Sequence, residues 1–453
     1  MPSQRLLKNC CVLLLAVALL GPLCFAAYAQ PPKATPAALP VPSIETIPRT
    51  DRARRATFEE QQSKTFIRKT EAHPVQGDRY VILTDHNEEA FLRPLERLAK
   101  HHAGTMLHVE DLGGLPKKLS AREELTARLR ELHPRFVAIA PRLENYRENV
   151  LLSMWEVLST LDPDPQLDVF PAWLVAPNQR AFEALIEHSI HYQPQGQEKL
   201  RPLVMGQVVD ASVTGLRSLQ KVGIIRNLFS QCGYTTASLV TRTYQARLAG
   251  GNDPSPPQQW EVAMAAPRQF ITQLPPPAKQ ALDEASLLLM FGHGAPGMTC
   301  SLDVGVFHDV RMENKVVLCG SCFSAYPLHS DFPPMPSGPD GSAIRNERER
   351  FAMRALENGA VVVYAHMRLN GGFPDLFPVL EGWMNGLTVG EAYQRLLNAV
   401  IDVNGFAPGD FVLRDEDADR QPAVMRRNAL LLVVIGDPAL QPMVSIGHRP
   451  GGP

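Results

Sequence analysis

Short apolar runs alternate with amphipathic stretches along the chain from about residue 80 onward. Within each run the apolar residues are continuous, which is typical of strands that are covered on both faces of a parallel sheet. The stretches between them carry apolar residues at helical spacing, as Phe91, Leu95 and Leu98 do within Glu88–Lys100. Strands that alternate with helices predict right-handed crossovers and a layered α/β fold.

The pattern divides into a first α/β region and a second, larger one. The predicted strands are Tyr80–Thr84, Thr105–Val109, Phe136–Ala140, Ala172–Val175, Val204–Val209, Ser238–Thr241, Ser286–Phe291, Val316–Leu318, Ala360–Ala365 and Leu430–Ile435. The predicted helices are Glu88–Lys100, Ala121–Leu132, Val150–Leu161, Leu216–Ser230, Glu347–Glu357 and Val389–Ile401. We therefore expect a smaller α/β subdomain at residues 76–200, a main domain at 201–446 and a short tail at 447–453.

The first residues have the character of a secretory signal. Arg5 and Lys8 precede an apolar run at Cys11–Leu20, and Ala27 and Ala29 provide the small residues that signal peptidase needs. We predict a signal peptide at 1–29 and an exported protein, either periplasmic, at the cell surface or secreted. The alternative is an uncleaved anchor, although the run is short for a membrane span. Residues 30–75 are rich in Pro and Ala and predict a linker or a pro-segment.

Composition narrows the function classes. The formal net charge is −2, with 45 basic and 47 acidic residues, and this balance argues against a nucleic-acid binder. Of seven cysteines, three lie in the predicted signal, and the remaining four are too few for a disulfide scaffold in so long a chain. A free thiol outside the cytoplasm is exposed to oxidation, so each of these four cysteines that is free is a candidate for a functional role. No later segment approaches the length of a transmembrane helix.

Two predicted strands end in residues that carry chemistry. Ser286–Phe291 is followed by His293 and Gly294, and Val316–Leu318 is followed by Cys322. The carboxyl ends of parallel strands are where ligands bind in α/β sheets, and neighbouring strands lie about 4.8 Å apart. We therefore expect both side chains to meet over one cleft.

Imidazole and thiol are suited to nucleophilic catalysis. An unperturbed cysteine is mostly thiol at neutral pH, and a nearby imidazole can take its proton and later protonate a leaving amine. Gly294 has no side chain, so its amide can approach a substrate carbonyl closely. With the amide of Cys322 it would form an oxyanion hole, in which one donor is worth roughly 3 kcal/mol.

These strand ends resemble the pattern of caspase-like (clan CD) cysteine peptidases, in which one apolar strand ends in His-Gly and a later one ends in a small residue and Cys. The order and spacing of later segments resemble the gingipain branch of that family over about Val204–Val444, and Tyr80–Val175 resembles its preceding α/β subdomain. The later segments that carry this resemblance are Glu357–Val363, Gly386–Ala392 and Leu432–Leu440.

The resemblance implies a caspase-like three-layer α/β/α sandwich with a mostly parallel sheet, and a cysteine-type endopeptidase that acts on protein or peptide substrates. It implies that His293 is the general acid/base, Cys322 the nucleophile and Gly294 an oxyanion donor. It implies no cofactor, while a structural calcium ion is an expectation without an assigned ligand set. The specificity residue and the oligomeric state are not assigned, and the acids considered for orienting the histidine are Asp283 and Glu284.

Other interpretations of the same residues remain open. A second thiol, Cys319, makes Cys319-Gly320-Ser321-Cys322 a candidate redox motif, although a small buried core thiol is the favoured interpretation of Cys319. A structural disulfide or half of a zinc site is another possibility for Cys319 and Cys322, and Cys300 with His308 is only a loose match to the second ligand pair that zinc needs. A non-catalytic caspase-like module that binds partners at the cell surface is the remaining alternative. We interpret His188 and His191 as surface residues of a helix rather than metal ligands, and the Gly-Asp-Pro at 436–438 as a structural turn.

Overall fold

The computed structural model describes residues 75–208, 217–242, 259–263, 271–331, 350–368, 376–407, 409–412 and 427–445. The predicted signal peptide, nearly all of the predicted linker and the tail lie outside these ranges. So do the Pro- and Gly-rich segments at 249–257, 334–341 and 371–372.

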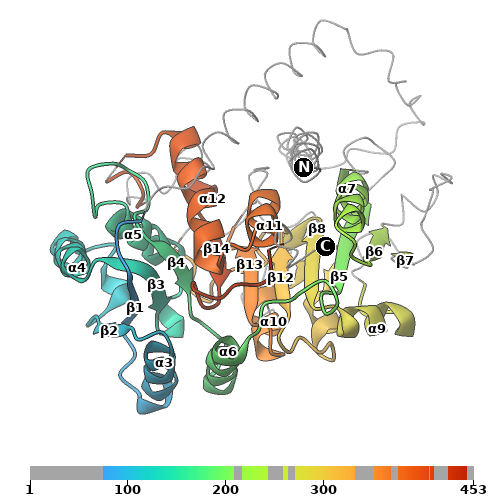
Figure 1. Cartoon of the computed structure of the whole chain (residues 1–453), viewed down its shortest axis with the longest axis horizontal. Coiled ribbons are helices and arrows are strands. Elements are labelled where there is room, and N and C mark those ends of the chain that lie inside the picture. The colour runs from blue at the N-terminus through green and yellow to red at the C-terminus, as the bar shows by residue number, and fades with distance from the viewer. Residues whose placement is uncertain are drawn as a thin grey trace, which may run out of the picture.

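The described strands form an eleven-stranded sheet in the order β2-β1-β3-β4-β14-β13-β12-β8-β5-β6-β7 (Figure 1). The sheet runs without a break across the predicted boundary at residue 200. Its strands are β1 (Arg79–Thr84), β2 (Thr105–His108), β3 (Pro134–Ala140), β4 (Phe170–Trp173), β5 (Pro202–Val208), β6 (Ala237–Arg242), β7 (Gln259–Ala263), β8 (Leu287–Phe291), β12 (Val316–Cys319), β13 (Val362–His366) and β14 (Leu432–Ile435). A separate small sheet contains β9 (Gly294–Ala295), β10 (Met298–Thr299) and β11 (Leu302–Asp303).

All neighbouring strands of the large sheet are parallel except β13 and β14, which are antiparallel. Because β14 is parallel to β4, strands β1 to β4 run in the opposite direction to β5, β6, β7, β8, β12 and β13. The prediction of a mostly parallel sheet is confirmed, and β14 is the strand at which the direction reverses.

Helices lie above and below the row of strands in Figure 1, which gives the three layers that the sequence predicted. In this view α7, α11 and α12 lie above the strands, and α3, α6, α9 and α10 lie below them. The helices are α3 (Glu89–His101), α4 (Leu119–Leu132), α5 (Glu148–Leu158), α6 (Gln179–His191), α7 (Arg217–Gln231), α9 (Pro276–Glu284), α10 (Phe351–Glu357), α11 (Leu376–Met384) and α12 (Val389–Asn404), with 3-10 turns η2 (Leu112–Gly114), η3 (Leu143–Asn145) and η4 (Val304–Phe307).

The elements predicted from the sequence are present with ends shifted by a few residues. The structure adds the helices α9 and α11, the strand β7 and the small sheet β9 to β11, which the sequence pattern did not assign as elements, and it gives the bounds of α6, the helix expected around His188 and His191. The strands β9, β10 and β11 have two residues each, which is too short for a periodic pattern. α9 begins with two prolines, Pro276 and Pro277, which fit the first turn of a helix because their missing amides need no partner there.

The start of α12 illustrates how local sequence fixes a junction. Thr388 accepts a hydrogen bond from the Glu391 amide at 3.2 Å, and Glu391 accepts one from the Thr388 amide at 2.8 Å, so the two form a capping box. A Cβ on Gly390 would lie 2.9 Å from the Cβ atoms of Phe170 and Pro438. Glycine therefore lets α12 begin directly against β4 and the turn that follows β14.

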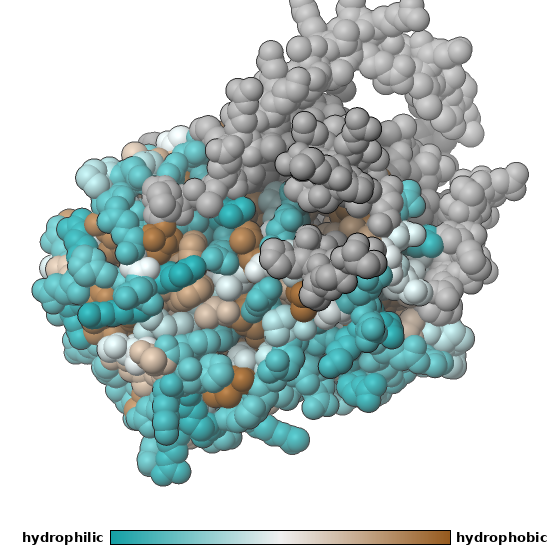
Figure 2. Space-filling model, in the orientation of Figure 1, coloured by the Kyte–Doolittle hydropathy of each residue, from teal (hydrophilic) through white to brown (hydrophobic). Residues whose placement is uncertain are grey.

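The face in view in Figure 2 is mostly hydrophilic where the structure is described, with hydrophobic residues scattered over it. The core lies on both faces of the sheet, and strands β8, β12, β13 and β14 are buried along their whole length. Within the described ranges, none of the helices has the length and apolar character that crossing a bilayer requires.

Candidate active site

His293 and Cys322 leave the sheet at equivalent points of two neighbouring strands. β8 and β12 are parallel and Met290 is paired with Cys319, whose following residue, Gly320, donates its amide hydrogen to the Met290 carbonyl at 3.0 Å. His293 and Cys322 each lie three residues beyond this pair. The predicted meeting of the two segments at one edge of the sheet therefore follows from the register.

Gly294 brings the two segments into direct contact. A Cβ on Gly294 would lie 2.1 Å from the Cys322 carbonyl oxygen, 3.0 Å from the Cys322 amide nitrogen and 2.8 Å from the Cβ of Ser321. No other residue fits this space without moving the backbone of the cysteine segment. The His-Gly and Cys segments are thus packed backbone to backbone, and both His293 and Cys322 are partly exposed.

The backbone of His293 is held on both sides. Its amide donates a hydrogen bond to Oε1 of Gln207, a buried residue of β5, at 2.6 Å. Its carbonyl accepts one from the amide of Cys300 at 2.9 Å. Sequence reasoning did not single out Gln207, because a lone glutamine at the end of a strand belongs to no motif.

The chain turns sharply directly after Cys322. Phe323 has a φ of 56°, in the left-handed region that a bulky residue rarely adopts. The amide of Phe323 donates to the Arg368 carbonyl at 2.9 Å, and that of Ala325 donates to the His366 carbonyl at 2.9 Å. Hydrogen bonds to the segment at the end of β13 therefore hold a strained backbone next to the thiol, as is common at functional sites.

A buried ion pair holds the loop that continues from Cys322 to residue 331. Arg368 and Glu148 lie 3.7 Å apart with side chains that are 7% and 0% exposed. Glu148 also accepts hydrogen bonds from the Ser330 hydroxyl at 2.6 Å and the Asp331 amide at 2.9 Å. Burial raises the pKa of Glu148, while these donors and Arg368 oppose the rise.

The guanidinium of Arg368 also lies over the rings of Phe323 and Tyr326, at 5.6 Å and 6.0 Å from their centres. Tyr146, from the segment before α5, donates a hydrogen bond to the Ala325 carbonyl at 3.1 Å. The first part of the chain therefore supports the loop that follows the candidate nucleophile.

Two fully buried thiols lie beside the site. Cys319 Sγ is 3.4 Å from the hydroxyl of Thr299, and Cys300 Sγ is 3.6 Å from that of Ser321. Burial, together with the nearby Cys319, raises the pKa of Cys300 to about 12, and burial likewise raises the pKa of Cys319. The interpretation of Cys319 as a small core thiol is confirmed, since such a thiol stays protonated and unreactive.

The two acids considered for orienting the histidine lie at the wrong end of the strand. Asp283 and Glu284 are at the end of α9, before β8, whereas His293 follows β8, and five residues of strand span roughly 16 Å. Asp283 binds Lys279 at 2.8 Å and the Arg311 amide at 2.8 Å, and these partners lower its pKa although burial opposes them. Nearness in sequence was misleading here.

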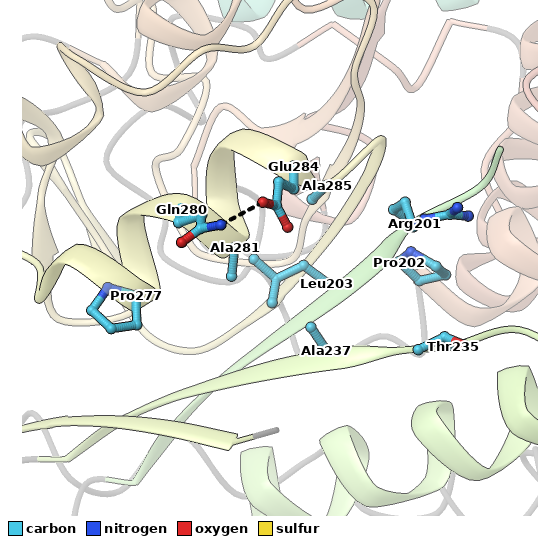
Figure 3. A pocket seen from close by; sticks show the side chains of 10 residues that line it. All are labelled: Arg201, Pro202, Leu203, Thr235, Ala237, Pro277, Gln280, Ala281, Glu284 and Ala285. Atoms are coloured by element: carbon cyan, nitrogen blue, oxygen red, sulfur yellow. Dashed lines mark hydrogen bonds between the residues drawn. The ribbon is translucent and has the colours of Figure 1, made fainter. Parts of the chain in front are cut away.

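Glu284 borders a pocket of about 390 Å³ beneath α9, at the amino ends of β5 and β6 (Figure 3). There Gln280 donates a hydrogen bond to Glu284 at 2.7 Å. The pocket lies at the edge of the sheet opposite to His293 and Cys322, because both of these follow the carboxyl ends of their strands. It is therefore separate from the candidate chemistry.

The proposed half zinc site is not supported by the structure. Cys300 is buried among hydroxyl groups, whereas His308 Nδ1 lies 3.0 Å from a guanidinium nitrogen of Arg354, a cation that competes with a metal ion. Within the described ranges, the residues whose ligand atoms cluster closely enough for an ion are Asp162, Asp164 and Asp168. Backbone amides of the same loop already bind each of these carboxylates.

The histidines of α6 and the residues of the Gly-Asp-Pro turn have structural partners. His191 is exposed as predicted, but His188 is partly buried and lies 3.1 Å from the Gly359 carbonyl oxygen. In the Gly-Asp-Pro turn, Asp437 accepts a hydrogen bond from Tyr80 at 2.9 Å and lies 2.7 Å from Nε2 of His102. The turn interpretation is confirmed, and this turn joins the end of the described chain to its beginning.

Comparison with known proteins gives a fold but no sequence relative. No protein-family model and no curated protein sequence matches the chain. Among solved structures, gingipain R, an Arg-specific cysteine proteinase, superposes with a TM-score of 0.52 at 13% identity, over 83% of this chain and 81% of that one.

Two further structures match less closely. One, described as a protease, has a TM-score of 0.46 at 12% identity, over 80% of this chain and 78% of that one. The other, the Saccharomyces cerevisiae separase–securin complex, has a TM-score of 0.34 at 14% identity, over 66% and 15%.

The chain thus has a caspase-like α/β fold. More particularly, its fold is similar to that of gingipain R. At this level of identity the likeness concerns the fold, and the activity of the chain depends on its own residues.

Proposed function

We propose that the protein is an exported cysteine endopeptidase in which Cys322 is the nucleophile and His293 is the general acid/base. The observation that carries the proposal is the contact between Gly294 and Cys322, whose oxygen lies 2.1 Å from the position of a Cβ on Gly294. Together with the shared register of β8 and β12, this contact supports the proposal that the imidazole of His293 and the thiol of Cys322 act on the same peptide bond.

In the proposed reaction His293 takes the proton of the Cys322 thiol. The thiolate then attacks the carbonyl carbon of a peptide bond, and the carbonyl oxygen becomes an oxyanion. The tetrahedral intermediate expels the amine, which takes a proton from His293, and a thioester remains on the sulfur. Water then attacks the thioester while His293 accepts its proton, which releases the acid and returns the thiol. The proposed chemistry requires no cofactor.

We propose that the amides of Gly294 and Cys322 donate hydrogen bonds to the oxyanion. Gly294 permits the close approach of the two backbones, and the left-handed turn at Phe323 gives the chain a sharp change of direction just after the thiol. Donors fixed in advance in this way lower the barrier without reorganising during the reaction.

The two alternative functions, a thiol-disulfide oxidoreductase and a non-catalytic binding module, are less well supported by the structure. A thiol-disulfide oxidoreductase needs two reactive thiols, whereas the raised pKa and complete burial of Cys319 keep it protonated. A binding module without catalysis does not need a histidine and a cysteine packed at the same strand ends. The export assignment rests on residues 1–29 of the sequence, and protein or peptide substrates are part of the proposal.

The test is labelling of the full chain with thiol-reactive peptide probes, such as a mixture of peptidyl acyloxymethyl ketones. We expect the wild type to label at Cys322, and Cys322→Ala and His293→Ala to lose labelling. Cys232→Ala is the matched control, because Cys232 is a partly exposed cysteine just after α7. Labelling that persists in Cys322→Ala would refute the assignment, and loss of function in Cys319→Ser would favour the redox alternative.

A further inference from the structure

The backbone amide of His293 is bound by a side chain from a strand that no motif marks. We propose that Gln207 is a positioning residue, which fixes the peptide carrying His293 so that its imidazole stays in place relative to Cys322. The inference rests on the proposed function, and it names a residue that the resemblance to cysteine peptidases did not supply.

Gln207 uses both ends of its amide. Oε1 accepts the hydrogen bond from the His293 amide at 2.6 Å, and Nε2 donates to the hydroxyl of Ser301. Gln207 is 5% exposed and Ser301 is 3% exposed, so water does not compete for either bond. A carboxamide is the uncharged side chain that accepts and donates at once, which suits a site where a charge would be costly to bury.

The neighbouring strand completes the arrangement. Gln207 is paired with Thr241 of β6, so both side chains lie on the same face of the sheet. The Thr241 hydroxyl donates to the Cys300 carbonyl at 2.7 Å, and the Cys300 amide donates to the His293 carbonyl at 2.9 Å. His293 is therefore held at its amide through β5 and at its carbonyl through β6.

Backbone strain in the same turn shows that this network restrains the chain. Cys300 and Ser301 have φ values of 50° and 65°, two consecutive non-glycine residues in the left-handed region. Such residues keep that conformation only where the surrounding structure holds them. Here the partners of the turn include Gln207 and Thr241, which belong to the large sheet.

Gly292 makes room for this contact. A Cβ on Gly292 would lie 2.8 Å from Oε1 of Gln207 and 2.9 Å from Sγ of Cys300. The glycine before the histidine is thus required by the glutamine, as the glycine after it is required by Cys322. Gly292 and Gly294 therefore both help to fix the position of His293.

Loss of the acceptor would let the His293 peptide shift, and a displacement near 1 Å of a catalytic group can cost about 100-fold in rate. The measurement is the rate at which iodoacetamide alkylates Cys322 in the folded full-length chain, relative to Cys232, followed by peptide mass spectrometry. An imidazole next to Cys322 raises its thiolate fraction and therefore this ratio, whereas Cys232 serves as an internal reference.

We expect the ratio to fall roughly 10- to 100-fold in His293→Ala and in Gln207→Ala. It should be largely restored in Gln207→Glu, because burial favours the neutral acid, which accepts from the His293 amide and donates to Ser301. Gln394→Ala is the matched control. Gln394 is also fully buried and donates to the Leu167 carbonyl at 2.7 Å, but in a different part of the fold. It should lower stability and leave the ratio unchanged.

The outcomes separate the two proposals. A ratio that falls in His293→Ala but not in Gln207→Ala overturns the positioning role and leaves the proposed function standing. A ratio that is unchanged in His293→Ala overturns the proposed function, and the positioning role with it. If Gln207→Ala does not fold, Ser301→Ala replaces it, because it releases Nε2 of Gln207; an unchanged ratio there also overturns the positioning role.

Discussion

Replacing Gly294 with alanine tests the contact on which the proposed site depends. The added Cβ would lie 2.1 Å from the Cys322 carbonyl oxygen and 2.8 Å from the Cβ of Ser321, and heavy atoms do not approach a Cβ to less than 3.0 Å without a shift. The neighbours are backbone and the first side-chain carbon, which cannot rotate away. One of the two segments must therefore move by about 1 Å, a displacement that can cost roughly 100-fold in rate.

The same change also affects stability, by about 1–3 kcal/mol, because overpacking forces backbone shifts. Gly294→Ala should therefore fold with a lowered urea midpoint and label at Cys322 about 100-fold more slowly than the wild type with the peptide probes. Stability and labelling are measured on the same preparation, so that a loss of labelling in folded protein is distinguished from unfolding.

Gly223→Ala is the matched control. Gly223 lies in α7 and a Cβ there would meet no atom within 4 Å. Alanine in a helix is favoured over glycine by about 1 kcal/mol, so this variant should be slightly stabilised and label normally. Gly294→Ala protein that labels at the wild-type rate would show that the two segments do not form one site.

Three further predictions concern the surroundings of the site. Glu148→Gln removes one partner of the buried ion pair with Arg368 and should lower the free energy of unfolding in urea by about 3 kcal/mol. Glu183→Gln, which removes an exposed ion pair with Arg97, should lower it by less than about 1 kcal/mol. Equal urea midpoints for the two variants would contradict a stabilising role of the Glu148–Arg368 pair. Cys300 and Cys319, fully buried with raised pKa values, should resist iodoacetamide at pH 8 until the chain is unfolded, and rapid modification in the folded protein would contradict their burial. Burial lowers the pKa of Lys315 from 10.5 to about 8, so the unfolded chain binds more protons than the folded one between these values. The free energy of unfolding should therefore rise with pH in that window by up to about 1.4 kcal/mol per pH unit, and a slope that is identical in Lys315→Met would exclude this lysine as its source.

The strands of the large sheet other than β7 could be predicted, because each is a continuous apolar run in the sequence. His293 and Cys322 could be paired for a related reason: each follows such a run, and parallel neighbours bring equivalent ends together. The direction of β14 could not be predicted, since a buried strand has the same apolar pattern whichever way it runs.

The residues that hold the His293 segment in place could not be predicted from the sequence, for a different reason. Gln207 and Thr241 form hydrogen bonds to residues that lie 94 and 59 positions later in the chain, and nothing in their local sequence marks these partners. Asp283 and Glu284 were considered because they are close to His293 in sequence, yet a strand separates them in space. Sequence shows which groups carry chemistry, whereas the groups that orient them depend on tertiary contacts.

The place of β14 has a consequence for how the protein is assembled. This strand, formed by Leu432–Ile435 near the end of the chain, lies between β4 and β13 in the middle of the sheet. Until it is inserted, β4 and β13 each present an unpaired apolar edge of the kind that invites association with other chains. The early and late parts of the described chain become one body only when β14 has been inserted, so a variant that ends before Leu432 would be expected to aggregate rather than to persist as a smaller folded unit.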